Sequence, residues 1–222
     1  MKIILIVSSL LYPLLLYPNQ LSKWISSTDR GSNDVIIELL QSDDLGTGIE
    51  AVRALGLRED PYVGDIIQYL YSSYSHSRYY EEELLLRFLL SSVFFARLDG
   101  AVLTERLSIN HDGIDLLVKN LYQFHDSLLK AEIVRLIPLA RRKEYLSMLL
   151  AVGRELEGLL KRQKGWLNTD QVEMFLQFLQ AAETIGSPDF TESCLSIYEL
   201  TRHPQVASRA GEAVRRLTEG HR

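Results

Sequence analysis

The fold class is indicated most clearly by the run Val35-Ile-Ile-Glu-Leu-Leu40, followed after an acidic turn by Ile49-Glu-Ala-Val-Arg-Ala-Leu-Gly56. In both runs the apolar residues recur at spacings of three and four, which places them on one face of an α-helix. Between the runs, Ser42-Asp-Asp-Leu-Gly46 supplies residues that end one helix and start another. Two amphipathic helices joined by so short a turn predict an antiparallel pair.

The same helical spacing continues along the chain, and no stretch alternates as a strand would. Its apolar positions are Val63, Ile66, Ile67 and Leu70; Leu84, Phe88 and Val93; Ile114, Leu117 and Leu121; Leu128, Ile133 and Leu136; Leu146, Leu149 and Leu150; Val172, Phe175 and Leu179; Leu195 and Tyr198; and Val206, Ala210, Val214 and Leu217. Proline at 61, 188 and 204 stands where a new helix should begin, because the first turn tolerates it. The sequence predicts an all-α protein.

Similar segments recur along the chain. Leu179-Gln-Ala-Ala-Glu-Thr-Ile-Gly186 aligns with Ile49 to Gly56, and Ala51-Val-Arg-Ala-Leu55 returns as Ala213-Val-Arg-Arg-Leu217. With intermediate copies the mean spacing is about 40 residues, and a period of that size containing two helices is typical of a helical solenoid.

On these residues the chain resembles the HEAT repeat family of armadillo-like α-solenoids. Val35 to Leu70 is similar to one and a half repeats, with Asp60-Pro61 opening the next pair. Cys194 to Leu217 is similar to another, with His203-Pro204-Gln205-Val206 where the family usually has Asp-Pro-x-Val. The resemblance implies a right-handed α-α superhelix of about four to five helical hairpins over residues 28–222, and a general role in binding. Repeat boundaries between about 75 and 131 are not fixed by the sequence.

The N-terminus has the layout of a secretory signal. Met1-Lys2 precedes an uncharged apolar run from Ile3 to Tyr17, which is shorter than the roughly 20 residues of a membrane-spanning helix. Cleavage after Ile25-Ser-Ser27 would release a mature chain near Thr28, although no Ala-x-Ala is present. We therefore predict a signal peptide over residues 1–27, with an uncleaved inner-membrane anchor or a buried first helix as the alternatives.

Composition narrows the classes of partner. The chain has 222 residues, 46% of them hydrophobic, and a net charge of −5. An acidic protein lacks the positive field that phosphate binding uses, so we expect no nucleic-acid partner. Cys194, the single cysteine, lies in an apolar pattern and is expected to be a buried residue that takes part in no disulfide.

The sequence gives no reason to predict an enzyme, a cofactor or a metal site. The histidines lack metal-ligand spacing, and no phosphate loop, nucleophile elbow or dinucleotide glycine pattern occurs; the histidines are His76, His111, His125, His203 and His221. Glu81-Glu-Glu83 is expected to be a solvated first turn of a helix, where negative charge suits the macrodipole.

Two clusters are candidates for partner binding. The first is a tyrosine-rich segment from Tyr69 to Tyr80, whose candidate contact residues are Tyr71, Tyr74, Tyr79 and Tyr80. Tyrosine is enriched at interfaces, although such rings also cap helix ends within a core. The second cluster is basic and comprises Arg141, Arg142 and Lys143, with Lys161-Arg-Gln-Lys164 at the next helix end. Basic runs mostly lie solvated at helix C-termini, but they also suit an acidic partner or an anionic lipid surface.

These observations lead to one hypothesis with two alternatives. We expect a noncatalytic protein-protein interaction or scaffold protein of the periplasm or cell envelope, which binds another protein through a solenoid surface. One alternative is an enzyme or nucleic-acid-binding protein on a HEAT-like scaffold. The other is a membrane-tethered structural envelope protein anchored by Ile3 to Tyr17.

Overall fold

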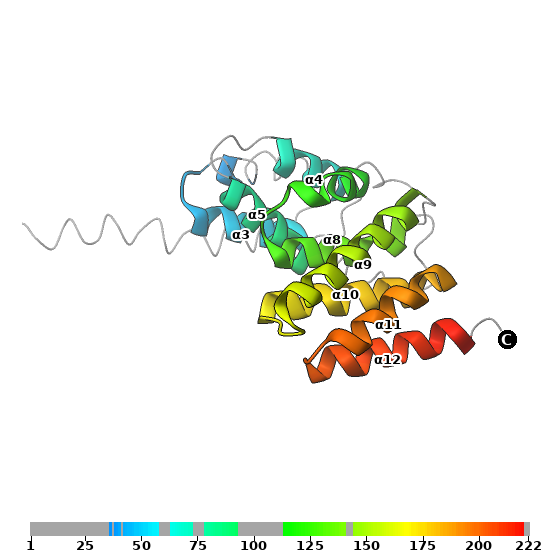
Figure 1. Ribbon diagram of the computed structural model, residues 1–222. Coiled ribbons are helices and arrows are strands. Elements are labelled where there is room, and N and C mark those ends of the chain that lie inside the picture. Colours follow the sequence, from blue (N-terminus) through cyan, green and yellow to red (C-terminus); the bar gives the residue numbers. More distant parts are fainter. Residues whose placement is uncertain are drawn as a thin grey trace, which may run out of the picture. The chain divides into compact units, whose positions relative to one another are not determined.

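The computed structural model describes residues 36, 38–40, 42–57, 63–72, 78–92, 113–140 and 144–219. Within these ranges every regular element is a helix, so the all-α prediction is confirmed for them (Figure 1). The predicted signal segment 1–27 lies outside them, as do Pro61 and Val93. The chain divides into two compact units, one of residues 1–60 and 87–97 and the other of 61–86 and 98–222.

The first unit contains α3 (Leu45–Gly56) and the end of α5 (Arg78–Ser91). Asp44 caps α3, because its carboxylate accepts a hydrogen bond of 2.8 Å from the backbone N–H of Thr47, as the acidic turn predicted. At its other end α3 approaches α5 closely: a β-carbon on Gly56 would lie 2.2 Å from Ser91 Oγ. Only glycine fits there.

The second unit begins with α4 (Val63–Ser72), the first part of α5 and a helical stretch at 113–119, followed by the short 3-10 helix η2 (Leu121–Gln123). Gly64 and Gly113 permit the close approach of α4 and the 113–119 helix, since a β-carbon on Gly113 would lie 2.7 Å from Gly64 Cα. Buried Tyr145 donates a hydrogen bond to the buried carboxylate of Asp115. This contact ties the 113–119 helix to the start of the next long helix.

The remaining helices of the second unit are α8 (Ser127–Ala140), α9 (Glu144–Gln163), α10 (Thr169–Ile185), α11 (Thr191–Leu200) and α12 (Pro204–Glu219), with the 3-10 helix η3 (Pro188–Phe190) before α11. Helices two apart in sequence pack together: α8 with α10, α10 with α12, and α9 with α11 (Figure 1). The consecutive helices α11 and α12 also pack along each other. The chain thus alternates between two rows of helices in this region.

The turns of this region follow the sequence signals. Gly186 ends α10 in the left-handed conformation at φ 70°, and Pro204 is the first residue of α12. After α9 the chain turns at Gly165, whose φ is 83° and whose carbonyl accepts a 2.9 Å hydrogen bond from the backbone N–H of Arg202. The Arg202 guanidinium lies 5.6 Å from the centre of the Trp166 ring.

The core is built largely from the predicted apolar faces, with two errors. Phe175, Leu179, Leu149 and Leu217 are buried as their spacing predicts. In α8 the sequence pattern selected Leu128, which is 36% exposed, whereas its neighbour Leu129 is fully buried. In α11 the sequence pattern selected Leu195 and Tyr198, but these are 42% and 50% exposed, whereas Cys194 and Ile197 are fully buried. The two faces differ by one residue, and a helix of only 10 residues carries too little periodicity to tell them apart.

Candidate functional site

Two of the predicted tyrosines contact the segment that comprises η2 and residues 124–126, here called the 121–126 segment. Tyr71, near the end of α4, donates a long hydrogen bond of 3.4 Å to Gln123 Oε1, and its ring meets that of Phe124 edge-on at 6.1 Å. Tyr79, in the first turn of α5, places its ring 6.2 Å from that of His125. Tyr79 is 75% exposed, so it offers its ring to solvent rather than to the core.

The other predicted tyrosines have different outcomes. Tyr80 is partly buried and already makes an interaction of its own. Tyr74 lies outside the described residues. The described members of the cluster therefore divide between α4 and α5, and the structure brings Tyr71 and Tyr79 to one segment that no sequence pattern connected with them.

A buried carboxylate holds the 121–126 segment against α5. Glu82 is 3% exposed and accepts hydrogen bonds from the backbone N–H of His125 at 2.8 and 2.9 Å and from that of Asp126 at 2.6 Å. Asp126 in turn accepts a 2.7 Å bond from the N–H of Leu129, in the first turn of α8. The expectation that Glu81 to Glu83 form a solvated turn is thus wrong for Glu82, because a helix turn points its three carboxylates in different directions.

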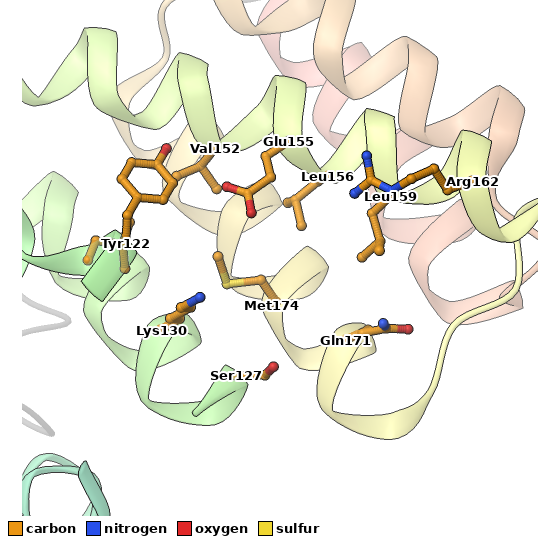
Figure 2. Close-up of a pocket in the computed structure, with 11 residues that line it drawn as sticks. Tyr122, Ser127, Lys130, Val152, Glu155, Leu156, Leu159, Arg162, Gln171 and Met174 are labelled. Carbon is orange, nitrogen blue, oxygen red and sulfur yellow. The ribbon is translucent and has the colours of Figure 1, made fainter. Parts of the chain in front are cut away.

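Leu121 and Tyr122 of the 121–126 segment help to line a pocket of about 210 Å³. Side chains from η2, α8, α9 and α10 line it: Leu121, Tyr122, Ser127, Lys130, Val152, Glu155, Leu156, Leu159, Arg162, Gln171 and Met174 (Figure 2). Leu121, Val152 and Leu156 are buried and form an apolar floor. Figure 2 shows Tyr122 and Lys130 toward one end of the pocket and Arg162 toward the other, with Glu155 and Met174 between them.

The Tyr122 end of the pocket has charges of both signs nearby, Glu155 and Lys130, whereas the other end has Arg162 (Figure 2). Partial burial raises the pKa of Tyr122, the nearby Glu155 carboxylate raises it further, and Arg154 opposes the rise. This end therefore holds a neutral phenol beside a carboxylate. Lys130 and Arg162 supply two positive charges, and neither forms an ion pair with another residue of the described ranges.

The basic cluster predicted from the sequence is only partly accounted for. Arg141, Arg142 and Lys143 lie outside the described residues. In the second run, Lys161 pairs with Glu157, while Arg162 lines the pocket. Adjacent helix positions point about 100° apart, which explains why neighbours in one basic run have such different surroundings.

The single cysteine lies buried beside an ion-paired carboxylate. Cys194 is buried, as predicted, and burial raises the pKa of its thiol to about 12, with a further contribution from Glu183. The Glu183 carboxylate pairs with Arg209 at 2.9 Å and Arg216 at 3.0 Å, which ties α10 to α12. Within the described ranges no group of three or more His, Cys, Asp or Glu side chains is placed to hold a metal ion.

The pocket escaped the sequence analysis. Its lining comes from four elements, and each contributes residues that look like an ordinary amphipathic face. The only local signal was an apolar row in α9, Val152, Leu156 and Leu159, interrupted by Glu155 and ending at Arg162. That row does not reveal a cavity, because the same spacing would serve for packing against another helix.

No protein-family model, no curated protein and no solved structure matches this chain. The resemblance to HEAT repeats therefore stays a prediction from the sequence.

Proposed function

We propose that this chain is a noncatalytic binding protein that recognises another protein through the surface on and beside the 121–126 segment. The single observation that carries the proposal is that this one segment both contacts exposed Tyr79 through its own exposed His125 and contributes Leu121 and Tyr122 to the lining of the pocket. Partner proteins gain most of their binding energy from aromatic side chains and from anchors that enter pockets. A surface that combines both suits a protein partner.

The anchoring of this segment supports the same proposal. Glu82 fixes the backbone at His125 and Asp126, and Asp126 caps α8, so the 121–126 segment is held at both its α5 and its α8 side. A surface that is already ordered loses little conformational entropy when a partner binds. We therefore place the recognition surface on this segment.

The packing of helices two apart in sequence, α8 with α10 with α12 and α9 with α11, supports a solenoid-like stack in this region. In such stacks each helix pair buries its apolar face against the next pair, and a continuous surface is left for binding. We propose that the second unit uses such a surface, in line with the HEAT-like pattern of the sequence.

We also propose that the protein is exported to the periplasm or cell envelope and that residues 1–27 direct the export. Among the described residues no helix is long and apolar enough to span a membrane. Intact-mass measurement of the protein recovered from its native cells tests the proposal: a mature terminus near Thr28 is expected, and an intact Met1 would show that the segment is retained.

Site-specific cross-linking in cells tests the binding surface. A photo-reactive phenylalanine analogue replaces Tyr79, Tyr122 or, as a control, Tyr198 on α11, which is 50% exposed, as Tyr122 is. The same partner protein should be captured from positions 79 and 122 and not from 198. Capture of identical proteins from all three positions, or of none from 79 and 122, would refute the proposed surface.

A further inference from the structure

We infer that the pocket beside the 121–126 segment is a specificity subsite that takes one apolar side chain of the partner together with a carboxylate adjacent to it. This inference rests on the proposed function, because it names what the binding surface selects. The partner feature is thus a short acidic peptide segment that contains an apolar residue.

The size and buried lining of the pocket indicate which apolar group it takes. Its volume of about 210 Å³ is below the range of roughly 300–1,000 Å³ that holds cofactors and drug-sized ligands. The floor is formed by Leu121, Val152 and Leu156, which are 1%, 1% and 5% exposed, with Met174 beside them. A pocket of this size with such a floor suits one aliphatic side chain, and the unbranched methionine adapts its shape to the occupant.

The two cations of the pocket favour a carboxylate in the ligand. Lys130 and Arg162 have no ion-pair partner within the described ranges, in contrast to Lys161, which pairs with Glu157. The Arg162 guanidinium lies along α9, where its Nη1 would be 3.3 Å from a β-carbon at Gly158. A guanidinium at a pocket rim is suited to binding a carboxylate through two parallel hydrogen bonds.

The opposite end sets the direction. There the Glu155 carboxylate would repel a carboxylate of the ligand and offsets the attraction of Lys130, whereas Arg162 lies at the other end (Figure 2). The acidic group is therefore expected at the Arg162 end, while the peptide N–H groups face Glu155. Since the whole chain carries a net charge of −5, this preference comes from the local arrangement and not from a general attraction for anions.

Methyl NMR of the full-length protein tests the inference directly, because Met174 reports from inside the pocket. The chain has three methionines, and Met148, elsewhere on α9, serves as the internal control. Substitution Met174→Leu assigns the signal. The probe is the capped peptide Gly-Asp-Leu-Asp-Gly, with one control peptide in which Ala replaces Leu and another in which Lys replaces both Asp residues.

The Asp-Leu-Asp peptide should shift the Met174 methyl signal in a saturable manner and leave Met148 unchanged. The Ala and Lys peptides should bind at least about tenfold more weakly, since the first loses the buried aliphatic side chain and the second meets the cations with like charge. Equal response to the Lys peptide, or no Met174 shift with the Asp-Leu-Asp peptide, would overturn the inference. A Met174 shift with phosphatidylglycerol vesicles but not with this peptide would also overturn it, in favour of a lipid surface.

Two adjacent charge reversals distinguish an effect of the pocket on peptide binding from an effect of the protein's net charge. Arg162→Glu should weaken the Asp-Leu-Asp peptide about tenfold and strengthen the Lys peptide, whereas Lys161→Glu changes the net charge equally and should alter neither. Equal effects of the two variants would contradict the inference. If the cross-links from Tyr79 and Tyr122 persist while these peptides show no preference, the proposed function stands and the subsite is wrong.

Discussion

Glu82 offers the sharpest test of how this chain builds its candidate surface. Replacement of Glu82 by alanine removes a buried acceptor that holds two backbone N–H groups, those of His125 and Asp126, at 2.6 to 2.9 Å. We expect the 121–126 segment to detach from α5 more readily, because no other acceptor replaces the carboxylate at these two donors.

The magnitude follows from the geometry. A hydrogen bond to a charged group contributes about 1.5–3 kcal/mol, so two donors on one carboxylate correspond to roughly 3 kcal/mol at the lower limit. That limit applies because His125 is exposed and water reaches its N–H once the carboxylate is gone. Glu82→Gln keeps one acceptor oxygen but loses the charge, and it should cost about half as much.

Amide hydrogen exchange measures this change at the affected atoms. A loss of about 3 kcal/mol corresponds to amide exchange about a hundredfold faster at His125 and Asp126 in Glu82→Ala. The exchange rates in Glu82→Gln should lie between those of Glu82→Ala and those of the unsubstituted protein. The matched control is Glu199→Ala, which removes an exposed helical glutamate and should leave both amides unchanged. Exchange at His125 and Asp126 within threefold of the original rate in Glu82→Ala would refute the reasoning.

Three further outcomes are expected elsewhere in the second unit. Burial raises the pKa of the Cys194 thiol to about 12, above its ordinary 9.0, so native protein at pH 8 should react with iodoacetamide far more slowly than unfolded protein. The free energy of unfolding should decline between about pH 9 and 12, because the thiol of the unfolded chain ionises first. Rapid labelling of the native protein would contradict this. Gly165→Ala should destabilise the protein by at least about 2 kcal/mol in urea unfolding, since the φ of Gly165 is 83° and the new β-carbon would lie 2.3 Å from the last carbonyl of α11. The control Gly158→Ala meets only a flexible guanidinium and should be neutral or mildly stabilising. Equal effects of the two substitutions would be evidence against the close approach at Gly165. Arg209→Ala should cost more than Arg216→Ala, because the two side chains are 28% and 61% exposed against the same carboxylate of α10, and thermal unfolding of both variants distinguishes them.

The sequence predicted secondary structure well where the helices are long and their ends are marked. In α10 the buried positions Phe175 and Leu179 and the terminal Gly186 agree with the local pattern. These features depend on residues a few positions apart, so the chain itself carries the information. In the short α11 the same approach selected the exposed Leu195 and Tyr198, because one and the same segment offers two faces of similar hydrophobicity.

The candidate site could be predicted only in fragments. Tyr79 was identified from the tyrosine-rich segment, because exposed aromatic residues beside a turn are a local signal. Its neighbour His125 lies 46 positions further along the chain, and the Glu82 carboxylate that fixes this contact looked like one of three solvated acids. No local pattern shows which of three consecutive glutamates faces the interior.

Sequence patterns alone were thus enough to predict that the chain is helical, where many of its helices begin and end, and that Cys194 is buried. The tertiary structure alone decided that Glu82 is an anchor, that Arg162 rather than Lys161 lines a pocket, and that Tyr79 and the pocket share the 121–126 segment. The physical reason is the separation along the chain of the residues that interact. Helices and turns are set by neighbours three or four residues apart, whereas a binding surface depends on which helix faces pack together and which side chains that packing leaves open to solvent.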